Sequence, residues 1–202
     1  MSNSSRIEVG VAQRPLRGES VCGDAYGVVE RDDLVCIALA DGLGHGPDAA
    51  VPAVRFCERV HSSPQAPLAQ LFASAHHDLS GTRGAAAAIL RLNKLERSLE
   101  FAALGNVELR ALCARPIHPV SFPGIVGQTS RRKITPFLSP LSHGDLLVLY
   151  TDGISKEFDL SRSAEGSAQA LAEGLLADHG VARDDATCIV VRWHCFEVKE
   201  TP

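Results

Sequence analysis

Eight short runs rich in Val, Ile and Leu, each bounded by Gly, Asp or Asn, are the feature that most constrains how this chain can fold. The runs predict strands over residues 6–11, 25–30, 34–40, 85–92, 99–104, 108–112, 146–151 and 187–194. Some neighbouring runs are separated by only a few polar residues, such as Asp32–Asp33 and Asn93–Lys94. This spacing is typical of antiparallel hairpins, because parallel strands need a much longer crossover connection.

Three other segments repeat apolar residues at the spacing of an α-helix, namely residues 49–61, 67–79 and 164–177. Pro52 must lie in the first turn of the first of these helices or kink it. Together the elements predict an α+β fold, with two antiparallel β-sheets packed as a sandwich and helices on both outer faces. Residues 114–142 contain five prolines and are interpreted as loops around short strands. A length of 202 residues predicts one catalytic domain, residues 1–202.

Composition excludes several classes of function. Twenty Lys and Arg against 24 Asp and Glu give a formal charge of −4, so no broad cationic surface is expected for nucleic acid. The longest apolar run, residues 34–40, is far shorter than the roughly 20 residues that span a membrane. The first residues contain no apolar core of a secretory signal, which predicts a cytoplasmic protein. The six cysteines form no Cys-x-x-Cys pair and are expected to be reduced core thiols.

Three acidic residues stand at the ends of predicted strands. Asp41 and Asp152 follow apolar runs, and Asp184 precedes the last one. If the strands alternate in direction, these carboxylates meet at one edge, where they would repel one another unless a multivalent cation lay between them. Oxygen ligands of this kind favour Mg or Mn. Each Asp alone is better explained as a turn former or a helix cap, so only the combination predicts a metal site.

The segment Asp41-Gly-Leu-Gly-His-Gly46 precedes a predicted helix and could bind an anion through its backbone amides. Its spacing differs from that of a dinucleotide-binding loop, because Pro47 stands where the last Gly of that fingerprint is needed. A Walker-type Gly-Lys-Ser/Thr sequence does not occur in the chain.

Six motifs occur in an order that resembles the metal-dependent protein phosphatases of the type 2C superfamily, and within it the short bacterial RsbX-like branch of stressosome serine phosphatases. The motifs are Cys22-Gly-Asp24-Ala-Tyr, Ala40-Asp41-Gly-Leu-Gly-His-Gly46, Arg83-Gly-Ala-Ala-Ala-Ala, Leu104-Gly-Asn106-Val, Gly144-Asp-Leu-Leu-Val-Leu-Tyr-Thr-Asp152-Gly and Arg183-Asp184-Asp185-Ala-Thr187. The resemblance implies a helix-flanked β-sandwich in which two Mn or Mg ions hold a hydroxide that attacks phosphoserine or phosphothreonine.

The resemblance also assigns roles by position. Asp41 would bridge the two metals, the backbone carbonyl of Gly42 would be a further ligand, and Asp152 and Asp184 would complete the set. Asp24 would bind a metal or accept a hydrogen bond from its water. Two divalent cations would offset these carboxylates and lower the pKa of the water between them.

The chain departs from the family pattern at the proton donor. Larger members have a His directly after the Asp-Gly pair, whereas Leu43 holds that position here. His45, two residues further on, is a candidate general acid or a solvent-facing loop residue. Many members also have an Asp where this chain has Asn106, so a third metal should bind more weakly.

The phosphate-holding Arg of larger relatives has no counterpart at the matching spacing. Arg14 or Arg17 could replace it, the metals alone could hold the phosphate, or each Arg could be an ordinary surface charge. The run Arg131–Lys133 could meet an acidic partner or form a solvated turn. His76–His77 is interpreted as an exposed helix end.

The leading hypothesis is therefore a Mn- or Mg-dependent phosphoserine/phosphothreonine phosphatase that acts on a phosphorylated regulatory protein of bacterial stress signalling, with a stressosome-type scaffold as the suspected substrate. A second hypothesis is a catalytically silent module of the same fold that binds phosphoproteins. A third is a hydrolase of small phosphate esters that uses the same metal chemistry.

Overall fold

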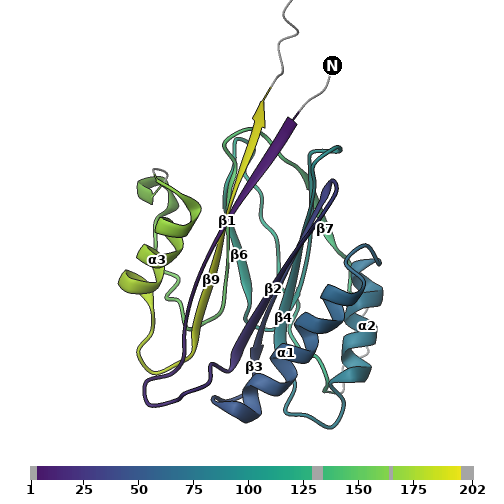
Figure 1. The fold of residues 1–202 in the computed structure, drawn as a ribbon, viewed down its shortest axis with the longest axis vertical. Coiled ribbons are helices and arrows are strands. Elements are labelled where there is room, and N and C mark those ends of the chain that lie inside the picture. The colour runs from purple at the N-terminus through teal and green to yellow at the C-terminus, as the bar shows by residue number, and fades with distance from the viewer. Residues whose placement is uncertain (1–3, 129–133, 164–165, 197–202) are drawn as a thin grey trace, which may run out of the picture.

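The computed structural model describes residues 4–128, 134–163 and 166–196. Figure 1 shows two sheets with helices on their outer sides. In chain order, the elements are β1 (Ser4–Arg14), β2 (Asp24–Arg31), β3 (Leu34–Gly42), α1 (Pro47–Ser62), α2 (Leu68–Asp78), β4 (Ala85–Asn93), β5 (Ser98–Leu104), β6 (Glu108–Leu112), β7 (Phe137–Pro140), β8 (Leu146–Tyr150), a short 3₁₀ helix (Leu160–Ser163), α3 (Ala168–His179) and β9 (Ala186–Phe196).

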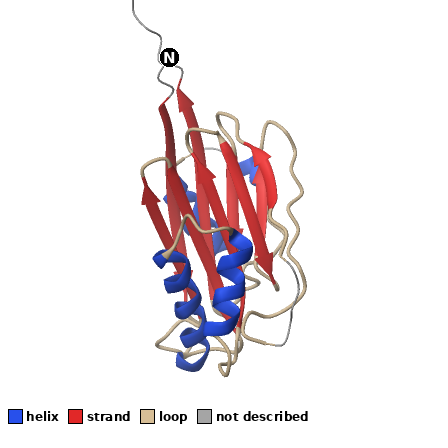
Figure 2. Cartoon of the chain, turned by 90° about the vertical axis from the view of Figure 1, so that its right-hand side faces the viewer, coloured by secondary structure: helices blue, strands red, loops and turns tan. Residues whose placement is uncertain are grey.

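The strands form two antiparallel sheets. One has the order β1-β9-β8-β6 and the other the order β2-β3-β4-β5-β7, and the paired strands run antiparallel in both. Helix α3 packs on β1 and β9, while α1 packs on β2 and β3 with α2 beside it. Figure 2 shows α1 and α2 lying across the strands of their sheet. The predicted sandwich with helices on both outer faces is confirmed.

Side-chain alternation along β3 explains why this run is apolar throughout. Cys36, Ala38 and Ala40 pack beneath α1 and α2, whereas Val35, Ile37 and Leu39 fill the space between the sheets. A central strand that is covered on both faces has no solvent-facing position for a polar residue. A third apolar layer lies between the four-stranded sheet and α3.

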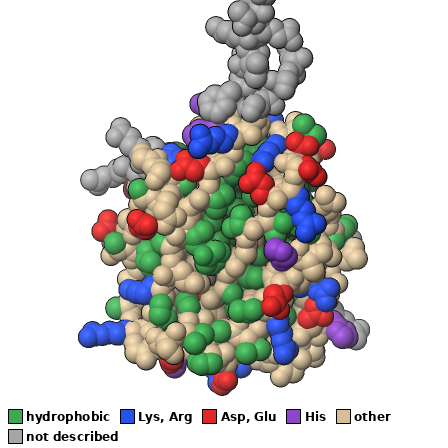
Figure 3. Space-filling view, in the orientation of Figure 1, with side chains coloured by type: hydrophobic (Ala, Val, Ile, Leu, Met, Phe, Trp, Pro, Cys, Tyr) green, Lys and Arg blue, Asp and Glu red, His purple; other side chains and the backbone are tan. Residues whose placement is uncertain are grey.

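Strands β1 and β2 are edge strands of their sheets. Along this edge of the sandwich, the apolar layer between the sheets is less completely covered than in its centre. Figure 3 shows hydrophobic side chains along the middle of the face seen in Figure 1, with charged side chains around them. Tyr26 and Val28 of β2 are the cross-strand partners of Leu39 and Ile37 on β3, so they lie on the face of the sheet that is turned toward the other sheet. Both side chains are nevertheless exposed. Part of the layer between the sheets therefore reaches the surface.

The proline-rich segment, interpreted as loops around short strands, contains the short strand β7, which pairs with β5 at the edge of the five-stranded sheet. The starts of two helices differ from the sequence-based elements. Helix α1 begins at Pro47, which suits the first turn of a helix, so Pro52 lies inside the helix and only the alternative that it kinks the helix stays a prediction. Helix α3 begins at Ala168, and residues 164–165 lie outside the described part.

All six cysteines are free, and Cys36, Cys57 and Cys188 are buried. Cys22, Cys113 and Cys195 are only partly buried, so the expectation of core thiols is confirmed for three of the six. Among the described helices, none is both long and apolar enough to cross a bilayer.

Two glycines allow the close backbone approaches that shape one end of the sandwich. A Cβ on Gly42 would lie 1.8 Å from the carbonyl oxygen of Ala49, so only glycine lets β3 turn directly into α1. A Cβ on Gly153 would likewise lie 1.8 Å from the carbonyl oxygen of Asp185. The first contact packs the end of β3 against α1, and the second packs the segment after β8 against the segment before β9.

Candidate metal centre

Four predicted ligands come from strand ends. Asp24 begins β2 and is the cross-strand partner of Asp41 on β3. Asp152 follows β8, and Asp184 precedes β9, which is the neighbour of β8. The charges of Asp24, Asp152 and Asp184 all act on Asp41, so the structure places the four carboxylates near one another.

Asp24 is the most deeply buried of these carboxylates, with 4% of its surface exposed. Its Oδ2 atom accepts hydrogen bonds from the hydroxyls of Thr187 at 2.7 Å and Thr151 at 2.9 Å. Burial raises the pKa of Asp24 to about 7; the two threonine hydroxyls oppose this shift, and nearby carboxylates add to it. The two threonines therefore fix the orientation of Asp24 and leave its charge only partly compensated.

Asp41 and Asp184 show the same lack of compensating charge. Burial raises the pKa of Asp41, and the negative charges of Asp24, Asp152 and Asp184 raise it further. Burial also raises the pKa of Asp184, with Asp152 the next contribution. Carboxylates crowded in this way favour protonation unless a cation lies among them.

Asp152 is exposed and accepts a hydrogen bond from Nδ2 of Asn106 to its Oδ2 atom at 2.6 Å. The sequence comparison with the family singled out Asn106 only as a missing acidic ligand. In the structure its amide is a donor that orients the Asp152 carboxylate. An Asp at this position would instead add a further negative charge.

Asp185 is a residue that the sequence reasoning did not single out as part of the site. It is buried, and its Oδ1 atom accepts a hydrogen bond from the backbone N–H of Leu16 at 2.8 Å. Its Oδ2 atom is buried and has no hydrogen-bond partner within the described residues. Asp185 therefore ties the loop before β2 to the segment that carries Asp184, and it belongs to the same motif in the sequence.

The loop between β3 and α1 carries the candidate general acid. His45 Nδ1 lies 2.7 Å from Oε1 of Glu19, which belongs to the loop between β1 and β2. Gly44 and Gly46 have positive φ angles of 98° and 69°, a backbone conformation that glycine adopts without strain. His45 is thus exposed in the loop that follows Asp41, and its Nδ1 atom lies against Glu19.

The candidate phosphate-binding arginines have different surroundings. Arg14 donates from Nη2 to the carbonyl oxygen of Val181 at 2.7 Å, so it supports the turn before Asp184. Arg17 is exposed in the loop between β1 and β2. Residues 131–133 lie outside the described part of the chain.

The interpretation of His76–His77 as an exposed helix end is wrong for His76. This residue is half-buried, and its Nδ1 atom accepts a hydrogen bond from the N–H of Gly127 at 3.2 Å. Helix packing turns one of the two adjacent side chains toward the neighbouring loop, whereas His77 faces solvent.

The donor set fits a hard divalent cation. All candidate ligands are carboxylate or carbonyl oxygens, and at Asp184 the nearby Arg183 offsets only part of the effect of burial and of Asp152 on the pKa. Among the described residues, no three His, Cys, Asp or Glu side chains converge as ligands of a single ion. This arrangement still suits Mg, which is commonly bound by one or two carboxylates and retains several waters.

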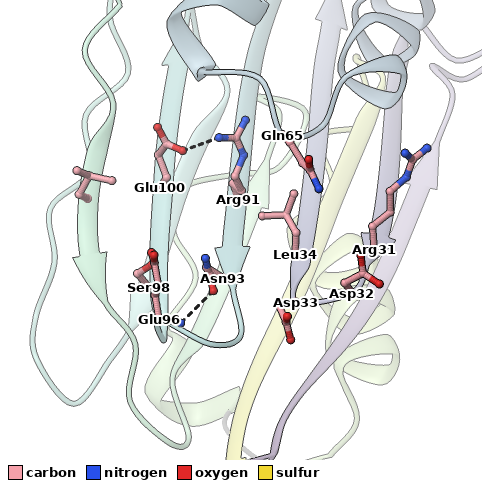
Figure 4. A pocket seen from close by; sticks show the side chains of 11 residues that line it. Arg31, Asp32, Asp33, Leu34, Gln65, Arg91, Asn93, Glu96, Ser98 and Glu100 are labelled. Atoms are coloured by element: carbon pink, nitrogen blue, oxygen red, sulfur yellow. Dashed lines mark hydrogen bonds and ion pairs between the residues drawn. The ribbon is translucent and has the colours of Figure 1, made fainter.

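A pocket of about 500 Å³ lies at the opposite end of the five-stranded sheet. Figure 4 shows that its lining comes from the β2–β3 and β4–β5 turns and from Gln65 between α1 and α2. Both basic and acidic side chains line it, and none of the clustered carboxylates does. The candidate metal centre is therefore separate from this pocket.

Comparison with protein families agrees with this geometry. A family model described as stage II sporulation protein E (SpoIIE) matches residues 31–194, which include Asp41, Asp152 and Asp184. The chain belongs to the SpoIIE/PP2C family. The chain is similar to RsbX in sequence and in structure, so the resemblance to RsbX-like phosphatases seen in the sequence motifs is confirmed.

Three relatives of this SpoIIE/PP2C chain illustrate the relationship. The phosphoserine phosphatase RsbX of Bacillus subtilis is 23% identical over 193 residues, which cover 94% of this chain and 96% of RsbX. A structure from work on the bacterial stressosome, a modular system adapted to control secondary messenger signalling, is 32% identical with a TM-score of 0.89, covering 93% of this chain and 100% of that one. A crystal structure of RsbX in complex with magnesium is 22% identical with a TM-score of 0.84, and the match covers 95% of this chain and 100% of that RsbX chain.

Proposed function

We propose that this protein is a Mg- or Mn-dependent phosphoserine/phosphothreonine protein phosphatase. The observation that carries the proposal is the gathering of Asp24, Asp41, Asp152 and Asp184 at one end of the sandwich, with too little positive charge around them. Crowded carboxylates raise the free energy of the folded state, so such a cluster is best explained as a site for cations.

Two ions would be held by oxygen atoms of this chain. Asp41 would bridge them, and the Gly42 carbonyl, Asp152 and Asp184 would provide further ligands, with Asp24 beside them. When bound, such cations offset the carboxylates, lower the pKa of a water molecule between them and screen the charge of a phosphate group.

The chain's own residues would orient these groups. Thr151 and Thr187 fix Asp24, and Asn106 fixes Asp152. Glu19 binds Nδ1 of His45 and so directs Nε2 away from Glu19. From that position, Nε2 would donate a proton to the serine oxygen that leaves the phosphate.

The exposure of the site supports a protein substrate. Asp152 and His45 both lie at the surface, so a phosphorylated side chain could reach them without the rest of the substrate being enclosed. The relationship to RsbX and to a stressosome structure supports a phosphorylated stressosome-type protein as the substrate. A cytoplasmic location follows from the same proposal.

A metal titration with a phosphoserine peptide tests the proposal. We expect no turnover in the presence of chelator, and activity that is restored by Mn or Mg more readily than by Ca, because sites with several retained waters suit the smaller ions. Full activity in chelator would contradict the metal mechanism.

Two further results, one from this titration and one from a comparison of substrates, identify the alternative functions. Binding of the peptide without turnover under all metal conditions would identify the silent binding module. Faster hydrolysis of a free phosphorylated metabolite than of a phosphoprotein would identify a small-ester hydrolase.

A further inference from the structure

A phosphoprotein brings further negative charge to an end of the sandwich that is already acidic, so nearby cations decide how the substrate is held. One such cation is Arg83, in the connection between α2 and β4. The carbonyl oxygen of Gly84 accepts a hydrogen bond from the N–H of Leu43 at 3.0 Å. The pairing of β3 with β4 therefore continues past Gly42 and places Arg83 beside the Asp41–Gly46 loop.

The side chain of Arg83 lies against this loop. Its Nη1 atom is 2.9 Å from the position that a Cβ would take on Gly44, three residues after Asp41. The backbone of Arg83 is held in place because Nε2 of Gln128 donates to its carbonyl oxygen at 2.9 Å. A Cβ at position 44 would press on the end of the Arg83 side chain, while the positive φ of Gly44 by itself favours glycine there.

The present partner of Arg83 is weakly held. Nη2 lies 2.6 Å from Oδ2 of Asp48, in the first turn of α1, and 48% of the Arg83 side chain and 75% of the Asp48 side chain are exposed. An exposed ion pair contributes little free energy, whereas a guanidinium binds a phosphate or carboxylate through two parallel hydrogen bonds. The pair can therefore open at small cost when another oxyanion approaches.

We propose that Arg83 is a substrate-binding residue that exchanges Asp48 for an oxyanion of the phosphoprotein, either the phosphate itself or a carboxylate beside the phosphoserine. The proposal rests on the proposed phosphatase function. It makes Asp48 a competitor of the substrate, so changes at the two positions have opposite effects.

The test measures KM and kcat for a phosphoserine peptide with acidic residues beside the phosphoserine. We expect Arg83→Ala to raise KM roughly tenfold with kcat little changed, since it removes a charge-assisted hydrogen bond to the substrate. Arg83→Lys should be intermediate, because it keeps the charge but not the planar fork. Asp48→Asn should lower KM about twofold, since it removes only an exposed competitor.

A matched control is Arg59→Ala. Arg59 also forms a partly exposed ion pair, with Oδ2 of Asp78 at 2.5 Å, but it lies on α1 about 18 Å from Pro47 at 1.5 Å per residue. This variant should leave KM unchanged. The metal-induced rise in Tm should remain the same in all four variants, because none of them is a proposed metal ligand.

Inorganic phosphate, used as a competitor, distinguishes the two oxyanions. If Arg83→Ala weakens inhibition by phosphate, Arg83 binds the phosphoryl group. If phosphate inhibits the wild type and the variant equally while KM rises only for peptides with acidic neighbours, Arg83 binds a carboxylate of the substrate.

Three results would overturn the proposal: an unchanged KM in Arg83→Ala, an equal rise in Arg59→Ala, or a rise in KM in Asp48→Asn, which would show that the ion pair merely supports the loop. Absence of metal-dependent turnover in the wild type would instead contradict the proposed function. Anisotropy measurements of phosphopeptide binding to the same variants would then still test Arg83.

Discussion

The two ends of the five-stranded sheet both carry many charged side chains, but they differ in how those charges are compensated. At the end where β3 begins, Nη1 of Arg91 donates to Oε2 of Glu100 at 2.9 Å (Figure 4). At the other end, about 24 Å along β3 at 3.4 Å per residue, Asp24 lies opposite Asp41 and both have raised pKa values. Paired charges support the fold, whereas crowded like charges mark a site that is completed by a ligand.

The largest expected effect comes from removing one carboxylate at the acidic end. Asp41→Asn should reduce metal-dependent turnover by more than about 100-fold, since loss of even an outer partner of a metal ligand costs roughly 10- to 100-fold. Asp33→Asn, at the other end of the same strand in the mixed-charge pocket, is the matched control and should retain activity. Steady-state kinetics with a phosphopeptide compare the two variants, and equal losses would remove the distinction between the two ends.

His45→Ala sharpens the same comparison at a single site. We expect it to reduce turnover less than Asp41→Asn, because water can also protonate a serine leaving group. Equal losses in the same assay would show that one of the two roles is misassigned.

In metal-free protein, the free energy of unfolding should change by about a few kcal/mol with pH. The pKa of Asp24 is raised in the folded state from 3.8 to about 7, so its contribution to stability is fully present below about pH 4 and is lost as the pH rises through 7. Each pKa unit corresponds to about 1.4 kcal/mol. Urea unfolding in chelator should therefore show falling stability between pH 4 and pH 8, and saturating Mg should reduce this slope. A flat profile in chelator would mean that the cluster is already compensated.

At the opposite end of the sheet, breaking the Arg91–Glu100 ion pair should lower the free energy of unfolding and leave the phosphatase activity unchanged. Arg91→Met removes the partner of Glu100 and the donor to the Ala66 carbonyl, and we expect a loss of roughly 2 kcal/mol of unfolding free energy. Phosphatase activity at 25 °C should remain. The double variant Arg91→Met/Glu100→Leu should recover part of the loss, because no carboxylate is then left unpaired. A drop in kcat with unchanged stability would contradict this division between the two ends.

The smallest expected effect is a stabilisation by Asp184→Asn in metal-free protein. The substitution removes one negative charge near Asp41 and Asp152, so the Tm in chelator should rise by about 1 to 3 °C, at 2 to 4 °C per kcal/mol. Metal affinity should fall at the same time, and with it the metal-induced rise in Tm. Thermal melts with and without Mn measure both changes, and a Tm like that of the parent under both conditions would show that Asp184 is a turn former.

Much of this contrast between the two ends could be predicted from the sequence. The apolar runs rich in Val, Ile and Leu predicted the strands of both sheets other than β7, because strand preference is a property of neighbouring residues. Asp41, Asp152 and Asp184 were recognisable because each interrupts or adjoins an apolar run. The short strand β7 was expected within the proline-rich segment but without bounds, since a four-residue edge strand depends on its pairing with β5, which lies far away in the sequence.

What the sequence by itself determined was therefore the order and type of the elements and which residues could supply oxygen ligands. Only the tertiary structure decided that Asp185 is buried against the Leu16 amide, that Arg14 supports the Val181 turn, and that Arg83 lies on Gly44. A hydrogen bond requires two atoms to lie within about 3 Å of each other. Between residues that are distant in the chain, that closeness is set by strand register and by the packing of loops, which no local pattern of residues records.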